Sequence, residues 1–168
     1  GYLTGRYNLR TGAIDVSSNR GIDRIALSEK TFGDYFQQAG YATALIGKWH
    51  NGLYCNDYLP HERGGFDLFF GFPNGEQDYW KWNLMRNGVY EAGGRYLSDV
   101  INDEAIAFIK QNRRKPFAIF LAHHAPHFPL QAPQALTDKY RQRVDGVHDE
   151  SVAIVYAMIE AMDTGLGR

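Results

Sequence analysis

Two short apolar runs, at residues 42–46 and 117–122, set the strongest limit on how this chain can fold. Each run is preceded by a helical pattern and followed by a polar loop, and each is shorter than a typical helix. The sequences Ala-Thr-Ala-Leu-Ile and Phe-Ala-Ile-Phe-Leu-Ala predict buried strands, the second apolar on both faces. Because helix, strand and loop follow one another in this order twice, we expect an α/β sandwich with a mostly parallel central sheet flanked by helices.

Three segments have the apolar spacing of amphipathic helices. Residues 31–39 place apolar side chains three and four positions apart and end at Gly40. Residues 97–112 carry the clearest apolar stripe and are followed by a basic run and by Pro116, which cannot continue a helix. Residues 151–162 have a third stripe. These segments supply the helices that the predicted sandwich requires.

The rest of the chain predicts loops and short elements. Residues 53–94 are rich in glycine, asparagine and aromatic residues, and they hold no long periodic run. Pro126, Pro129 and Pro133 predict an extended loop after the second strand. We find no internal repeat, low-complexity segment or linker, so the sequence predicts one domain or part of one.

Composition and charge exclude several classes of protein. With 44% hydrophobic and 22% charged residues, the composition is that of a folded chain. The net charge of −1 provides no field that would attract nucleic acid or an anionic membrane. No apolar run approaches the roughly 20 residues that a membrane helix needs. The one cysteine, Cys55, permits no internal disulfide and no cysteine-rich metal site, and we expect it to be a loop or packing residue.

A lysine and a histidine stand at the end of the first apolar run. Lys48 and His50 are two residues apart, so in an extended chain they project to the same side. The loops at the carboxyl ends of strands are where open α/β sheets usually build their active sites. A cation beside a titratable imidazole suits an anionic substrate. Lys48 and His50 are therefore candidate site residues.

Three more histidines follow the second strand. His127 stands between two prolines, which restrict its loop and would hold its imidazole in place at low entropic cost. His127 is therefore a candidate site residue, whereas we interpret His123 as a hydrogen-bonded structural residue and leave both roles open for His124. Because His123 and His124 are adjacent, they would point apart in an extended segment, which argues against a three-histidine zinc site.

Three stretches closely resemble the sequence motifs of the sulfatases. Residues 40–50 resemble the second sulfatase signature, which reads Gly-Tyr, a Thr two residues on, and then Gly-Lys-x-His. Residues 125–133 resemble a sulfatase Ala-Pro-His-x-Pro-Leu-x-Ala-Pro segment. Residues 3–6, Leu-Thr-Gly-Arg, resemble the end of the first signature. Weaker matches at residues 65–72 and 156–163 keep the order of the family.

The resemblance implies a sulfuric ester hydrolase of the alkaline phosphatase superfamily, with a role for each matched residue. Lys48 would bridge the nucleophile and a sulfate oxygen, His50 would be the base that collapses the covalent intermediate, and His127 would bind sulfate near the leaving oxygen. The nucleophile of the family is a formylglycine made from Cys or Ser, and the register places it a few residues before Gly1. Ca²⁺ or Mg²⁺ completes the family site, and its ligands match no residue in this chain.

The same resemblance implies how the chain relates to a whole sulfatase. We expect residues 1–168 to be the central part of a single sulfatase catalytic domain, truncated at both ends. Because the nucleophile and the metal ligands would then lie outside it, the chain alone is expected to be inactive. The habit of the family implies a periplasmic, secreted or lysosomal location.

The substrate would be an aryl or carbohydrate sulfate ester. Trp80 and Trp82 are candidate substrate-binding residues because aromatic faces stack on sugar rings, and packing against the domain is the alternative for both. Two other functions stay open: a phosphate or phosphonate ester hydrolase of the same superfamily, and a non-catalytic anion-binding relative. The residues immediately before Gly1 would distinguish the two enzymes, because a sulfatase needs Cys or Ser in its signature context.

Overall fold

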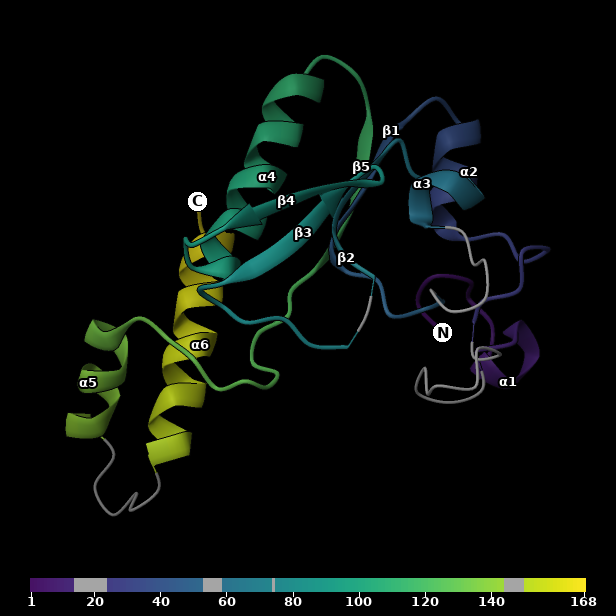
Figure 1. The fold of residues 1–168 in the computed structure, drawn as a ribbon. Coiled ribbons are helices and arrows are strands. Elements are labelled where there is room, and N and C mark those ends of the chain that lie inside the picture. The colour runs from purple at the N-terminus through teal and green to yellow at the C-terminus, as the bar shows by residue number, and fades with distance from the viewer. Residues whose placement is uncertain (14–23, 53–58, 74, 144–149) are drawn as a thin grey trace.

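The computed structural model describes residues 1–13, 24–52, 59–73, 75–143 and 150–168 (Figure 1). The strands are β1 Ala42–Lys48, β2 Leu68–Phe72, β3 Trp82–Arg86, β4 Val89–Gly93 and β5 Phe117–Ala122. The helices are α1 Asn8–Thr11, α2 Phe32–Gln38, α3 Pro60–Arg63, α4 Leu97–Asn112, α5 Gln134–Arg143 and α6 Glu150–Leu166. Among these described helices, none combines the length and the apolar character needed to cross a membrane.

The sheet is mixed, with strand order β4–β3–β2–β1–β5. β1 pairs in parallel with β2 and β5, whereas β3 runs antiparallel to β2 and β4. The β3–β4 hairpin turns at Asn87 and Gly88, whose φ angles of 43° and 89° suit a two-residue hairpin turn. The expected parallel character therefore holds for β1, β2 and β5 only. Three strands lie within residues 53–94, where five-residue strands are too short to show a long periodic run.

Each face of the sheet has its own apolar core. Ala44 and Ile46 of β1 pack in a cluster with residues of α4 and α6, whereas Leu45 and Trp49 pack with Leu3 and other residues near the N-terminus. In Figure 1, α4 and α6 lie on one side of the sheet, and α2, α3 and the N-terminal segment lie on the other. The predicted α/β sandwich is confirmed. The alternation along β1 puts Lys48 on the same face as Ile46.

Several predicted elements are confirmed. α4 and β5 have the predicted bounds, 97–112 and 117–122. α2 begins after Thr31. The backbone N–H and the hydroxyl of Thr31 both donate to the carboxylate of Asp34 over 2.7 Å, and these bonds form part of a capping box. α6 covers the predicted residues 151–162 and extends beyond them at both ends. α5 directly follows the proline-rich loop and was not predicted, because its sequence has a low mean hydropathy and no continuous apolar stripe.

β5 is an edge strand, and the prediction that it is buried is wrong. Phe117 is 36% exposed, and the other five residues of the strand are half-buried. β5 pairs with β1 on one side, and no strand among the described residues pairs with its other side. A continuous apolar run shows that a strand has two apolar faces, but it does not show how many strands pair with it.

Two glycines permit the close approach of β1 to its neighbours. A Cβ atom on Gly47, whose φ is +112°, would lie 1.9 Å from the carbonyl oxygen of Ala122 on β5. A Cβ atom on Gly71 of β2 would lie 1.8 Å from the carbonyl oxygen of Gly47. Neither position can hold a larger residue without moving a strand. The three parallel strands therefore meet at the residue before Lys48.

We expect Gly47→Ala to destabilise the chain far more than Gly40→Ala. Gly40 also has a positive φ, +83°, but no atom of the described residues would lie within 4 Å of a Cβ atom there, so only backbone strain of about 1–2 kcal/mol is added. At Gly47 the clash with Ala122 should add at least about 2 kcal/mol to the loss in the free energy of unfolding. Urea denaturation of both variants measures the difference, and equal losses would contradict the steric role of Gly47.

Candidate active site

The carboxyl ends of β1 and β5 bring two of the predicted motifs together. In the parallel register Gly47 lies opposite Ala122, so the loops that follow Lys48 and Ala122 leave the same edge of the sheet. Beyond the end of β1, the backbone N–H of Trp49 donates to Phe72 over 3.0 Å. Both loops therefore begin from positions fixed by neighbouring strands.

Lys48 and His50 stand on either side of a buried tryptophan. Trp49 is buried in the core on the opposite face and donates its indole N–H to Gly52 over 3.1 Å. Lys48 and His50 are both half-buried. His50 has a φ of 47°, in the left-handed region that favours glycine, and its N–H donates to the carbonyl of Pro73 over 2.9 Å. A strained backbone held by a hydrogen bond is typical of functional positions.

His127 presents an exposed imidazole from a closed turn. Its backbone N–H donates to the carbonyl of His124 over 2.9 Å, and its own carbonyl accepts the Tyr79 hydroxyl over 3.1 Å. Its ring Nδ1 lies 2.9 Å from the carbonyl oxygen of Phe128. Because a carbonyl can only accept, Nδ1 carries a proton in this bond, and Nε2 takes no part in it.

The electrostatics couple the three predicted site residues. Burial lowers the pKa of His50 most, and the charges of Lys48 and His127 lower it further. Burial also lowers the pKa of Lys48, while the carboxylate of Glu76 acts in the opposite direction. The structure therefore brings Lys48, His50 and His127 into one electrostatic environment. It combines positive charge with an imidazole that is neutral at neutral pH, which suits anion binding with proton transfer.

Of the two other histidines of the cluster, His123 is half-buried and His124 is buried. His123 Nε2 lies 3.1 Å from Oδ1 of Asn102 on α4, and burial lowers the pKa of His123 to about 4. This geometry agrees with the structural role predicted for His123. His124 is only 3% exposed, and its ring stacks on those of Tyr79 and His127. The sequence left the role of His124 open because Tyr79, on which its ring packs, belongs to a segment that is distant along the chain.

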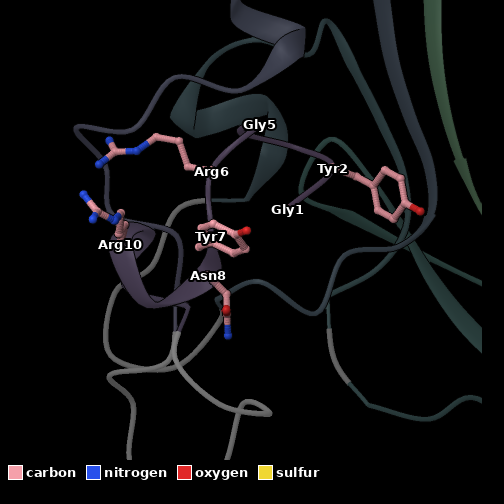
Figure 2. A pocket seen from close by; sticks show the side chains of 7 residues that line it. All are labelled: Gly1, Tyr2, Gly5, Arg6, Tyr7, Asn8 and Arg10. Carbon is pink, nitrogen blue, oxygen red and sulfur yellow. The ribbon is translucent and has the colours of Figure 1, made fainter.

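The N-terminal segment lies beside His50. A cavity of about 270 Å³ is lined by His50, Asn51 and Phe120 together with residues 1–4. A larger surface pocket, about 900 Å³, is formed by the N-terminal segment itself (Figure 2). Figure 2 shows Arg6 among the residues that line this pocket. The Arg6 side chain pairs with Glu29 over 2.7 Å. We take the smaller cavity as part of the candidate site, because it contains a titratable side chain from the strand end.

The two predicted tryptophans have different environments. Trp82 is 9% exposed, belongs to the apolar core and donates its indole N–H to the carbonyl of Arg95 over 2.7 Å. Trp80 is 39% exposed, and its ring packs on Tyr96 with the centroids 5.0 Å apart. Trp82 therefore packs in the core, and Trp80 is the member of the pair whose ring can reach a ligand.

The described residues offer no set of ligands for the divalent cation that the resemblance to sulfatases implies. Within the described ranges no group of three or more His, Cys, Asp or Glu residues is placed to hold a metal ion. Cys55, which the sequence assigned to a loop or packing role, lies outside the described residues. No chemical step is therefore assigned to a metal held by these residues.

Comparisons with known proteins agree on one family. The chain is 28% identical over 190 residues to YdeN of Escherichia coli, described as an uncharacterized sulfatase, with 99% of this chain and 33% of that protein covered. It is 29% identical over 184 residues to the N-acetylglucosamine-6-O-sulfatase of Bacteroides thetaiotaomicron, with 98% of this chain and 30% of that protein covered. The chain thus spans about a third of the length of these curated relatives.

A solved structure shows the same fold. The crystal structure of Ps i-CgsB superposes with a TM-score of 0.86 at 26% identity, over 98% of this chain and 41% of that chain. The same protein in complex with k-i-k-neocarrahexaose gives a TM-score of 0.80. The family model for sulfatases matches residues 1–168. With Lys48, His50 and His127 gathered at one edge of the sheet and this match along its whole length, the chain belongs to the sulfatase family.

Proposed function

We propose that residues 1–168 form the central part of a single catalytic domain that hydrolyses sulfate monoesters. The observation that carries this proposal is the meeting of Lys48, His50 and His127 at the adjoining carboxyl ends of β1 and β5. The comparisons support the position within a larger domain, because nearly all of this chain aligns with about a third of each curated relative.

The chemistry of a sulfate ester matches what these side chains can supply. Negative charge develops on the sulfate oxygens and on the leaving oxygen, so the site needs cationic and hydrogen-bonding groups around the sulfate and a proton for the leaving oxygen. In our proposal Lys48 binds a sulfate oxygen from its half-buried position, and His127 directs its ring Nε2 at the ester. His50 is the base, because its lowered pKa leaves the imidazole neutral at neutral pH.

The remaining parts of the site are assigned to sequence outside residues 1–168. We propose that the formylglycine nucleophile of the family precedes Gly1, which lines the same cavity as His50. We assign the ligands of the divalent cation to other segments of the longer protein. This chain therefore contributes the wall of the site that binds sulfate and exchanges protons.

We further propose that the substrate is a carbohydrate sulfate. One relative is named as an N-acetylglucosamine-6-O-sulfatase, and the structure of Ps i-CgsB has been solved with a neocarrahexaose. In this chain, Trp80 offers a half-exposed indole ring supported from behind by Tyr96. Such a ring can stack on the face of a sugar.

The intact protein that contains residues 1–168 should release sulfate from N-acetylglucosamine 6-sulfate or from an aryl sulfate, and the 168-residue chain alone should release none. We expect alanine at Lys48, His50 or His127 to lower kcat/KM by about 100-fold or more. Ion chromatography of released sulfate measures this, with the matching phosphate ester tested in parallel.

Three outcomes of this assay would contradict the proposal. Faster turnover of the phosphate ester would favour a phosphatase of the same superfamily. Sulfate binding without turnover by the intact protein would favour a non-catalytic relative. Turnover by the 168-residue chain would show that the site does not need residues from outside it.

The pKa of His50 should lie below 6.5 in the intact protein and rise when neighbouring charge is removed. Lys48→Gln and His127→Gln each take away a positive charge that disfavours the imidazolium, so each should raise this pKa, Lys48→Gln by more. Histidine NMR titrations measure the shift. Lys139→Gln is the charge-matched control because Lys139 pairs with Glu160, and it should leave the pKa of His50 unchanged.

Trp80→Ala should raise KM for a carbohydrate sulfate and leave KM for a small aryl sulfate nearly unchanged, because only the sugar would use the indole platform. Loss of one stacking contact should change KM by roughly tenfold. Trp82→Ala is the comparison variant, and it should lower the melting temperature because the ring is in the core. Equal losses on both substrates for Trp80→Ala would assign Trp80 to packing instead.

A further inference from the structure

His124 lies directly beneath the exposed imidazole of His127. The two rings stack with centroids 5.0 Å apart and an interplanar angle of 29°. The His124 ring also stacks on Tyr79, with ring centroids 5.1 Å apart and an interplanar angle of 22°. Phe72 packs edge-on against His124, with ring centroids 5.2 Å apart. His124 is thus held by aromatic rings from the end of β2 and from the segment that precedes β3.

Hydrogen bonds fix the same arrangement. The backbone N–H of Gln77 donates to His124 Nε2 over 3.3 Å, so the ring is anchored from a segment outside its own loop. The carbonyl of His124 accepts the N–H of His127, and the Tyr79 hydroxyl donates to the His127 carbonyl. The ring and the backbone of His124 therefore both contact His127. Tyr79 contacts both histidines, through its ring at His124 and through its hydroxyl at His127.

The burial of His124 decides what kind of role it can have. At 3% exposure its ring cannot reach a substrate, so it is not a catalytic residue. Burial, followed by the charges of His127 and Lys48, lowers the pKa of His124 to about 4, which keeps the ring uncharged at neutral pH. A charged ring at this distance would repel a protonated His127 and Lys48. An uncharged ring can support His127 without opposing a cation there.

We propose that His124 is a positioning residue, whose stacked ring holds the His127 imidazole in the orientation that sulfate binding requires. This inference rests on the proposed function, because it assigns a use to the orientation of His127. The stack is the essential part of the role, so an uncharged aromatic ring at position 124 should preserve it. A small side chain should leave His127 free to rotate, because the ring would lose its support.

A double-mutant cycle in the intact protein tests the inference. His124→Ala should lower kcat by about tenfold or more, since small losses of orientation are costly in catalysis, and His124→Phe should retain activity within about threefold. The double variant His124→Ala/His127→Ala should be no slower than His127→Ala, because His124 acts through His127. His123→Ala is the matched control: it removes the neighbouring half-buried imidazole, which pairs with Asn102, and its effect should be independent of His127.

Two outcomes would overturn the positioning role. If the losses from His124→Ala and His127→Ala multiply in the double variant, His124 acts independently of His127. If His124→Phe is as slow as His124→Ala while both melt at the same temperature, the stacked ring is not what matters.

A spectroscopic readout separates this inference from the proposed function. If the intact protein turns over no sulfate ester, the proposed function fails, and histidine ¹⁵N NMR then tests the stack directly. The ring signals of His127 should shift in His124→Ala and stay in place in His123→Ala. Unchanged His127 signals in His124→Ala would overturn the positioning role, whether or not the protein is an active hydrolase.

Discussion

The pairing of β1 between β2 and β5 is the constraint on which the candidate site depends. Gly47 and Gly71 let these three parallel strands pair: a Cβ atom at Gly47 would collide with Ala122 of β5, and one at Gly71 of β2 would collide with Gly47. Because the strands end together, the loops that follow them leave one edge of the sheet. Lys48 is the last residue of β1, so the pairing of β1 with β2 and β5 also sets the position of this lysine in the site.

The site combines charge and neutrality in a small space. The ammonium of Lys48 lies half-buried near His50, whose pKa is lowered by burial and by the neighbouring positive charges. Glu76 acts on Lys48 in the opposite direction and favours its charged form. A site built this way offers a cation for an oxyanion and a neutral imidazole for a proton at the same pH. That division of roles agrees with membership of the sulfatase family.

Aromatic rings connect the site to the body of the domain. The ring of His127 rests on His124, which rests on Tyr79, and Tyr79 in turn stacks on Tyr96 with the centroids 5.6 Å apart. Trp80 packs on the other end of this series through Tyr96. The proposed sulfate-binding histidine and the proposed sugar platform are therefore supported by one continuous set of rings, which is anchored at the N-terminal end of α4.

Elements whose signals are local follow from the amino-acid sequence alone. The apolar stripe of a helix, followed by a proline that ends it, predicts the observed bounds of α4. Residues 40–50 and 125–133 indicate the family and supply the three candidate site residues. The hairpin was open to prediction as well, because Asn87-Gly88 is a strong turn signal, although the short strands around it hid the pattern.

Properties that depend on contacts between distant segments follow from the tertiary fold and not from local sequence patterns. It placed β5 at an edge, buried Trp82 in the core and left Trp80 half-exposed. It also buried His124, whose role the sequence left open, and stacked its ring on those of Tyr79 and His127. Spacing along a chain predicts which side chains share a face, whereas burial and ring contacts depend on which other segments pack there.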